Sequence, residues 1–412
     1  MTAQDDMMGL IDGALDRRQL LALLSAAIVA PSASAQIAAV PVEKALRAFV
    51  RRHVGGQRAP GVSVAAVLPD GRTIAVAGGL ADPATARPMT PATRLMSGST
   101  GKTFAAATAM ALVDAGKLSL DAPISRLFAD EPWYARLPNA KALTLRMLLQ
   151  HSEGFPQFLD QLDFQWAFTT DAIRGRDIGY SPRKMLSFIL DEPPLFAPGA
   201  RHSYSDLGYH LAGLAMEKAT GKGYYELLDG LILSRLKSPD VIAATSTDLP
   251  GLATGFARGD ILAAMAGMTG RTTDAAGHLR HTPKLEYTGG GLALTPRALA
   301  QFYWKLAKGQ ILPPASFKTM MDSSLPLPGA AQPDVSQAYG LGMFITKRPE
   351  LGRYISHSGY YPGYSSNVAM LLDHGIAVAV QQNSDHGDDI YAMLKELAAA
   401  VIAANASSPA SS

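Results

Sequence analysis

Apolar and polar positions alternate along a short stretch near the beginning of the chain. Gly61–Leu68 follows the two-residue period of a β-strand. The pair Asp70-Gly71 is a strong hairpin signal, and Thr73–Ala77 has the pattern of a returning strand. The sequence therefore predicts an early β-hairpin.

Strand patterns resume from about residue 353. Three more strands are expected, at Tyr354–His357, Ser366–Leu372 and Ile376–Val380. Helical apolar spacing precedes the first hairpin at Val42–His53 and follows the last strand at Ile390–Ala404. Strands at both ends of the chain predict one antiparallel sheet, built from both termini and flanked by helices.

The middle of the chain, from about residue 120 to 283, has short helical patterns broken by proline and glycine. The clearest are Leu143–Leu149, Pro182–Leu190 and Tyr209–Ala219. We therefore expect an α+β fold in which a mainly helical region is inserted into the sheet domain. The active site is expected at their junction.

Residues 1–35 have the features of a removable export signal. Arg17-Arg18 is a twin-arginine pattern, Leu20–Ala30 is an apolar stretch too short to span a bilayer, and Ala33-Ser34-Ala35 is a small-x-small cleavage site. An ordinary amphipathic first helix is the alternative. On the export interpretation the protein is periplasmic or secreted from a bacterial cell, without a stable membrane anchor after cleavage. The catalytic domain would then span 36–404, followed by a disordered tail at 405–412.

The composition narrows the possible chemistry. The chain has 412 residues, no cysteine and a formal net charge of +2, so thiolate catalysis and disulfides are excluded and nucleic-acid binding is not indicated. The nine histidines lack metal-ligand spacing, and we expect neither a metal nor another cofactor. The expected partner is a small-molecule or peptide substrate, and the oligomeric state stays open. The acidic segment Asp385–Asp389 is expected to cap the final helix.

Ser99 and Lys102 are the clearest catalytic candidates. They lie three residues apart at the start of a predicted helix that ends near Gly116. Residues at this spacing share a helix face, so the Lys102 amine can meet the Ser99 hydroxyl and act as base or proton relay. Free N–H groups at the helix N-terminus also favour a developing negative charge.

A nucleotide-binding loop is a rival interpretation of the same residues. Residues 96–103 match G-x-x-x-x-G-K-[ST] at every fixed position except the first, where Met96 replaces glycine. The preceding Pro91–Leu95 is not a convincing apolar strand, and an export signal argues against a nucleotide enzyme. A degenerate P-loop NTPase is therefore a remote alternative.

Two later motifs complete a chemical set. They are Tyr204-Ser205-Asp206 and His357-Ser358-Gly359, the latter followed by Tyr360. With Ser99–Lys102 they resemble, in order and spacing, the S-x-x-K, S-D-N and K-T-G motifs. The chain thus resembles the serine β-lactamase and penicillin-binding-protein superfamily over nearly all of Val42–Ala404. Within it, the closest branch is the class C β-lactamase-related group, with its D,D-peptidases and family VIII-type esterases. The resemblance implies a β-lactamase/transpeptidase-like fold.

The resemblance and the chemistry imply a role for each motif. Ser99 would attack a carbonyl carbon and become acylated, while Lys102 would accept or relay its proton. Tyr204 would protonate the leaving group or orient the deacylating water. The backbone N–H groups of Ser99 and Tyr360 would form the oxyanion hole, and Gly359 would let its strand approach the substrate closely.

Two positions depart from the pattern of the family. Asp206 stands where many relatives have asparagine, and an ionised aspartate can only accept hydrogen bonds. If Asp206 holds Lys102 charged, Tyr204 is favoured as the base. His357, followed by Ser358, stands where β-lactamases have lysine, and imidazole is a weaker partner for a substrate carboxylate.

The sequence therefore predicts a serine hydrolase that forms an acyl-enzyme on Ser99 and cleaves a small ester, amide, D-amino-acid peptide or β-lactam. The alternative is a penicillin-binding or sensing module with little turnover. His151 and His202 are expected to be structural. Trp166 and Tyr287 are expected either to line a pocket or to pack in the core.

Overall fold

The computed structural model describes residues 33–55, 59–259, 267–327 and 334–407. Most of the expected export signal (1–32) and most of the expected tail (408–412) lie outside these ranges. Within them, no helix is long and apolar enough to cross a membrane.

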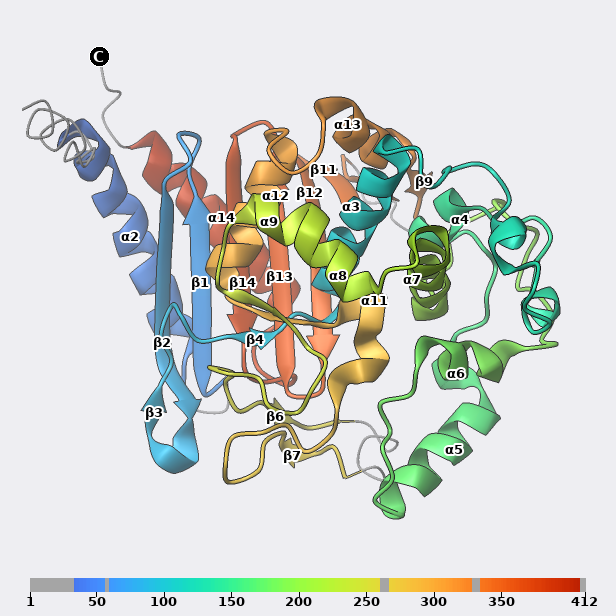
Figure 1. Cartoon of the computed structure of the whole chain (residues 1–412). Helices are drawn as coiled ribbons and strands as arrows, with labels where there is room; N and C mark the ends of the chain where they lie inside the picture. The colour runs from blue at the N-terminus through green and yellow to red at the C-terminus, as the bar shows by residue number, and fades with distance from the viewer. Residues whose placement is uncertain (1–32, 56–58, 260–266, 328–333, 408–412) are drawn as a thin grey trace, which may run out of the picture.

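A nine-stranded antiparallel sheet forms the centre of the molecule (Figure 1). Its strands are β1 (Gly61–Val67), β2 (Thr73–Asp82), β3 (Arg87–Pro88), β9 (Leu325–Pro326), β10 (Ser336–Tyr339), β11 (Phe344–Arg348), β12 (Gly352–Tyr361), β13 (Tyr364–Leu371) and β14 (Ile376–Gln382). They follow the order β3-β2-β1-β14-β13-β12-β11-β10-β9. The two ends of the chain meet where β1 pairs with β14, as the sequence predicted.

Helices cover both faces of this sheet. Helices α2 (Ala33–His53) and α14 (Ile390–Ala406) lie side by side on one face, and α12 (Pro296–Ala307) covers β1, β13 and β14 on the other. The alternation along β1 explains this division, because successive side chains of a strand point to opposite faces. Val64 packs with the α2 and α14 core, whereas Ala65 belongs to the core that includes α12.

The mainly helical region extends from the side of the sheet, where α4–α7 lie at the right of Figure 1, to its front, where α8 and α9 lie. Its helices are α4 (Leu145–Leu149), α5 (Leu162–Ile173), α6 (Pro182–Leu186), α7 (Asp206–Thr220), α8 (Tyr224–Leu228) and α9 (Ser234–Leu236). It also contains the short strands β5 (Val241–Ala243), β6 (Phe256–Ala257) and β7 (Gly270–Arg271). A small sheet in the order β4-β8-β5, with β4 at Leu95–Met96 and β8 at Leu292–Leu294, links this region to the turn that carries Ser99.

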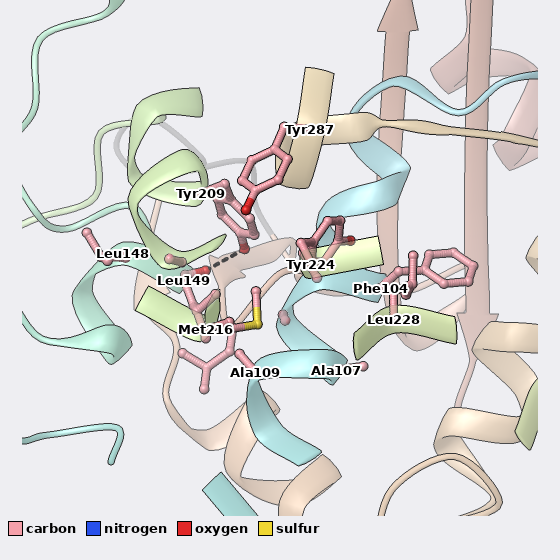
Figure 2. Close-up of a cluster of buried hydrophobic side chains, with 14 of the residues drawn as sticks. Phe104, Ala107, Ala109, Leu148, Leu149, Tyr209, Met216, Tyr224, Leu228 and Tyr287 are labelled. Atoms are coloured by element: carbon pink, nitrogen blue, oxygen red, sulfur yellow. Dashed lines mark hydrogen bonds between the residues drawn. The ribbon is translucent and has the colours of Figure 1, made fainter. Parts of the chain in front are cut away.

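Helix α3 (Gly101–Asp114), which follows the turn that carries Ser99, is buried between the two parts. Figure 2 shows aromatic and aliphatic side chains packed around it, from α4, α7, α8 and α11 (Tyr287–Gly290). The Tyr209 hydroxyl donates a 2.8 Å hydrogen bond to the Leu149 carbonyl and so ties α7 to α4. This packing fixes the helix on which Ser99 and Lys102 depend.

Several elements differ from the sequence expectation. The first helix begins at Ala33 rather than Val42 and therefore includes the last residues of the expected signal. Ser99 lies on a 3₁₀ turn, Gly98–Thr100, that continues into α3. The sequence patterns did not predict α12, α13 (Pro314–Asp322) or β9–β11. The expected cap is confirmed, since Asp389 accepts a hydrogen bond from the Tyr391 N–H at the start of α14.

Candidate active site

Ser99 stands where three elements meet. It is half-buried on the turn before α3. Gly98 has φ +49°, and a methyl group there would overlap the Tyr360 backbone, so β12 passes directly beside this turn. From the other side, a methyl group on Gly101 would lie 2.6 Å from the Gly290 carbonyl oxygen. Glycine is needed at both positions because backbone approaches backbone.

Lys102 is fully buried and directs its ammonium group at Ser99. The Nζ atom donates to Ser99 Oγ at 2.9 Å, to Asp206 Oδ1 at 2.6 Å and to the Gly289 carbonyl at 2.8 Å. An ammonium group has three donors, and all three are used here. The predicted Ser99–Lys102 contact is therefore present, and the third partner, Gly289, was not foreseen.

The charge on Lys102 is maintained by Asp206. Burial alone would lower the pKa of Lys102, but the Asp206 carboxylate outweighs burial and, together with Tyr204, raises that pKa above the ordinary lysine value. Asp206 is the first residue of α7, and its side chain is only partly exposed. The hypothesis that Asp206 holds Lys102 charged is thus supported by geometry.

Tyr204 lies beside Lys102, with its ring centroid 5.0 Å from Nζ. Its hydroxyl is buried and has no direct hydrogen-bond partner among the described residues. Burial raises the pKa of Tyr204 to about 12; the Lys102 charge lowers that pKa and Asp206 raises it. The His151 ring packs on Tyr204 at 4.1 Å between centroids, and His151 Nδ1 accepts a hydrogen bond from the Ser205 N–H. His151 therefore positions the Tyr204 segment, consistent with its expected structural role.

Strand β12 brings the third motif to the same place. A methyl group on Gly359 would overlap the Ser97 carbonyl oxygen, so this glycine allows β12 to pass beside the turn that carries Ser99. The partner that approaches Gly359 is thus the protein's own backbone. This arrangement brings the backbones of Ser99 and Tyr360 together, as an oxyanion hole requires.

His357 is buried and neutral. Its Nδ1 donates to the Ser358 carbonyl at 2.6 Å, so Nε2 accepts from the Tyr339 hydroxyl at 2.9 Å. Burial and the nearby Lys102 charge lower the pKa of His357 to about 3. The imidazole therefore carries no charge at neutral pH and cannot act as the cation that lysine supplies in β-lactamases.

Two cavities meet at Ser99 and Tyr360. We call the one of about 340 Å³ the aromatic cavity; it is lined by Ser99, Phe158, Leu159, Phe164, Phe168, Asp206, His210, Met268, Leu285, Glu286, Gly289, Tyr360, Tyr361 and Pro362. We call the other, of about 460 Å³, the acidic cavity; it is lined by Ser99, Tyr204, Phe344, His357–Tyr360, Ser365, Gln382, Asp385 and Gly387–Tyr391. The latter includes three aspartates and, among its described lining residues, no lysine or arginine.

The other sequence candidates are placed as follows. Ser358 lies at the acidic cavity, where its hydroxyl is 2.8 Å from that of Tyr391. His202 is buried against Tyr339. Tyr287 packs in the core, whereas Trp166 is 77% exposed, lies outside the core and lines neither of the two cavities.

Glu286 is a site residue that the sequence analysis missed. It lies three residues beyond the end of the region expected to be mainly helical, and it belongs to none of the motifs that the sequence showed. Among the described residues, no cluster of three or more histidine, aspartate or glutamate side chains could hold a metal ion.

Comparison with known proteins agrees with this architecture. The family model described as Beta-lactamase matches residues 46–402. Penicillin-binding protein 4* of Bacillus subtilis is 24% identical over 281 residues, covering 67% of this chain and 57% of that protein. Esterase EstB of Burkholderia gladioli is 31% identical over 172 residues, covering 39% and 41%. The chain thus spans about half the length of these two relatives.

A solved structure extends the similarity over the whole fold. D-amino acid amidase from Ochrobactrum anthropi SV3, complexed with D-phenylalanine, superposes with a TM-score of 0.70 at 25% identity, covering 90% of this chain and 99% of that chain. The fold and the matched region define a member of the β-lactamase/transpeptidase-like superfamily. The chain belongs to the Beta-lactamase family. The family match covers residues 96–103, so the interpretation of these residues as a degenerate P-loop is not supported.

Proposed function

We propose that the protein is a serine hydrolase that forms an acyl-enzyme on Ser99 and transfers the acyl group to water. The observation that carries the proposal is the 2.9 Å hydrogen bond from Lys102 Nζ to Ser99 Oγ at the start of a buried helix. In attack, the Ser99 oxygen bonds to the carbonyl carbon and its proton passes to a base. The carbonyl oxygen becomes an oxyanion, which the N–H groups of Ser99 and Tyr360 would stabilise.

Tyr204 is the base that the charges favour. Lys102 already donates through all three of its N–H bonds, so it would first have to lose a proton that Asp206 stabilises. The phenolate form of Tyr204 lies beside the Lys102 ammonium, which favours that form electrostatically. Tyr204 would take the proton of Ser99 and then give it to the leaving group. In deacylation, Tyr204 would accept a proton from water and return one to Ser99.

The two cavities would bind different parts of the substrate. Tyr204 lines the acidic cavity, so the leaving group that it protonates would lie there, and the acyl group would occupy the aromatic cavity. The acidic cavity is unsuited to a leaving group that carries a carboxylate, because it offers aspartates and a neutral His357. Esters and amides with uncharged leaving groups are therefore the favoured substrates. D-amino-acid peptides and β-lactams, which carry a carboxylate, are less favoured.

The test is hydrolysis of p-nitrophenyl acetate and butyrate by the full chain and by Ser99→Ala. We expect Ser99→Ala to lose activity. We also expect the mass spectrum of the quenched native enzyme to show an acyl adduct on Ser99. Equal rates in both proteins would refute the nucleophile. A stoichiometric adduct that persists without turnover would instead identify the slowly releasing penicillin-binding module.

We also propose that residues 1–35 direct export to the periplasm or the medium, a proposal that rests on the sequence pattern alone. Expression in a bacterium with a functional twin-arginine pathway should give a protein that begins at Gln36. Arg17→Lys/Arg18→Lys should retain the uncleaved chain in the cytoplasm. Cleavage that is unaffected by this pair of substitutions would argue against the twin-arginine route.

A further inference from the structure

The aromatic cavity contains a carboxylate that has no hydrogen-bond or ion-pair partner among the described residues. Glu286 lines this cavity, and no hydrogen bond or ion pair holds its carboxylate within the described part of the chain. A methyl group on Gly290 would overlap Glu286 Oε2 and would lie 2.9 Å from the Gly98 carbonyl oxygen. The carboxylate therefore lies next to the turn that carries Ser99.

Among the described lining residues, the other ionisable groups beside Glu286, apart from the two tyrosines, are Asp206, which is paired, and His210, which is neutral. Asp206 is bound to Lys102, and burial lowers the pKa of His210 to about 4. Burial and the Asp206 charge raise the pKa of Glu286 to about 7, opposed by the Lys102 charge. An unpaired carboxylate in a partly dry site is costly, and a cation bound beside it would remove that cost.

Away from Ser99 and the two tyrosines, the rest of the described wall is apolar. Phe158, Phe164 and Phe168 form a continuous aromatic surface, with ring centroids 4.7 Å apart for the first pair and 5.2 Å apart for the second. Leu285 and Met268 extend it. A cavity of about 340 Å³ with this lining can accept a phenyl or branched aliphatic group.

We propose that the aromatic cavity selects acyl groups that carry both an ammonium group and an apolar side chain, with Glu286 as the residue that binds the ammonium. This inference rests on the proposed function and deepens it, because it names the substrate class as esters or amides of hydrophobic amino acids with a free amino group. Glu286 is then a specificity-determining residue. It lies on the acyl side of the reacting carbonyl, opposite Tyr204.

The test compares two esters that differ only in the amino group: phenylalanine methyl ester, as each enantiomer, and 3-phenylpropanoic acid methyl ester. The native protein should show the higher kcat/KM for at least one phenylalanine ester. Glu286→Gln should reduce the ratio of the two kcat/KM values at least about 10-fold, the scale of a lost charged hydrogen bond. Glu192→Gln, at an exposed position, is the matched control and should leave the ratio unchanged.

A second readout does not depend on turnover of these esters. 2-Phenylethylamine should inhibit hydrolysis of p-nitrophenyl acetate more strongly than 2-phenylethanol, and Glu286→Gln should abolish the difference. The inference is overturned if the native protein does not prefer the ammonium compounds, or if Glu286→Gln leaves the preference intact while hydrolysis still depends on Ser99. Hydrolysis that survives Ser99→Ala would instead overturn the proposed function.

Discussion

Lys102 and Asp206 form an ion pair of 2.6 Å, in which the lysine side chain is fully buried and the aspartate is partly exposed. The pair neutralises the charge of Lys102 at the point where the proposed mechanism removes a proton from Ser99. Asp206 raises the pKa of Lys102 and also that of Tyr204. Both candidate bases are therefore held protonated at neutral pH.

Asp206→Asn should make both Lys102 and Tyr204 easier to deprotonate. The amide keeps the shape of the side chain but removes a negative charge, so the pKa values of Lys102 and Tyr204 should both fall. Activity that requires the deprotonated base rises as pH passes the pKa of that base. In the variant this rise should therefore move to lower pH, by at least about one unit. The measurement is kcat/KM for p-nitrophenyl acetate between pH 6 and 10. The Tyr204 pKa of about 12 lies above this range, so the shift should appear as a kcat/KM at least about 10-fold higher in the variant at each pH.

The control for that experiment is Asp163→Asn, which removes a charge from the exposed surface of α5. Asp163→Asn should have the same dependence of kcat/KM on pH as the native protein. A profile that is the same in Asp206→Asn and the native protein would show that Asp206 does not set the pKa of the base.

Lys102→Ala should reduce the rate of acylation at least about 100-fold, the usual scale for a lost proton-transfer group. Either role for Lys102 gives this loss, because the variant lacks both a relay and the charge that stabilises the phenolate of Tyr204. The rate of acylation is measured directly by stopped-flow detection of the p-nitrophenol released from p-nitrophenyl acetate. Lys141→Ala, at an exposed position, is the control, and an undiminished burst in Lys102→Ala would remove Lys102 from the mechanism.

His357→Lys should change which leaving groups are accepted. A lysine at this position would place a cation at the acidic cavity, where the native imidazole is neutral. The acylation rate of a carboxylate-bearing β-lactam should rise relative to that of a neutral ester. His357→Gln keeps the position neutral and should not raise this ratio. A ratio that is equal in the two variants would contradict the role assigned to the charge.

The sequence predicted the parts of the fold that have strong local signals. The β1–β2 hairpin, β12–β14 and α14 follow from alternation, turn residues and apolar spacing, and all are present. Strands β9–β11 were not predicted because they are short and only partly buried, so their hydrophobic pattern is weak. Helix α12 has a cap signal at Thr295-Pro296, and its start could have been identified from it.

In the candidate site, too, the sequence predicted the residues that belong to motifs and missed features that depend on packing. The motifs predicted that Ser99, Lys102, Tyr204 and Asp206 would meet, and their spatial proximity is confirmed. The neutrality of His357 depends on its burial, which no spacing reveals. Glu286 is an isolated acidic residue in the sequence, and only the packing of α11, which it directly precedes, against the Ser99 turn brings it to the candidate site.

Gly359→Ala should damage both stability and activity. The added methyl group would overlap the Ser97 carbonyl oxygen, so β12 or the Ser99 turn must shift. Overpacking of this kind costs about 1–3 kcal/mol in the free energy of unfolding, and displacement of the Tyr360 N–H should lower kcat by at least about 10-fold. Urea unfolding and p-nitrophenyl acetate hydrolysis measure the two effects.

The matched control is Gly223→Ala. Gly223 has φ −67° and no atom within 4 Å of the added methyl position, so stability should change by less than about 0.5 kcal/mol. If Gly359→Ala behaved as this control does, the close approach of β12 to the Ser99 turn would be wrong.

His202→Phe should make the protein more resistant to acid. Burial lowers the pKa of His202 to about 4 in the folded state, against about 6.5 when unfolded. A group whose pKa is lowered by folding stabilises the fold above its unfolded pKa, and this contribution is lost as pH falls from 6.5 towards 4. Because pH 5 lies between these two pKa values, a large part of this contribution is lost there. Phenylalanine keeps a ring against Tyr339 and cannot take up a proton. Urea unfolding at pH 7.5 and 5.0 should therefore show a smaller loss of stability in the variant, and equal losses would contradict the burial of a neutral His202.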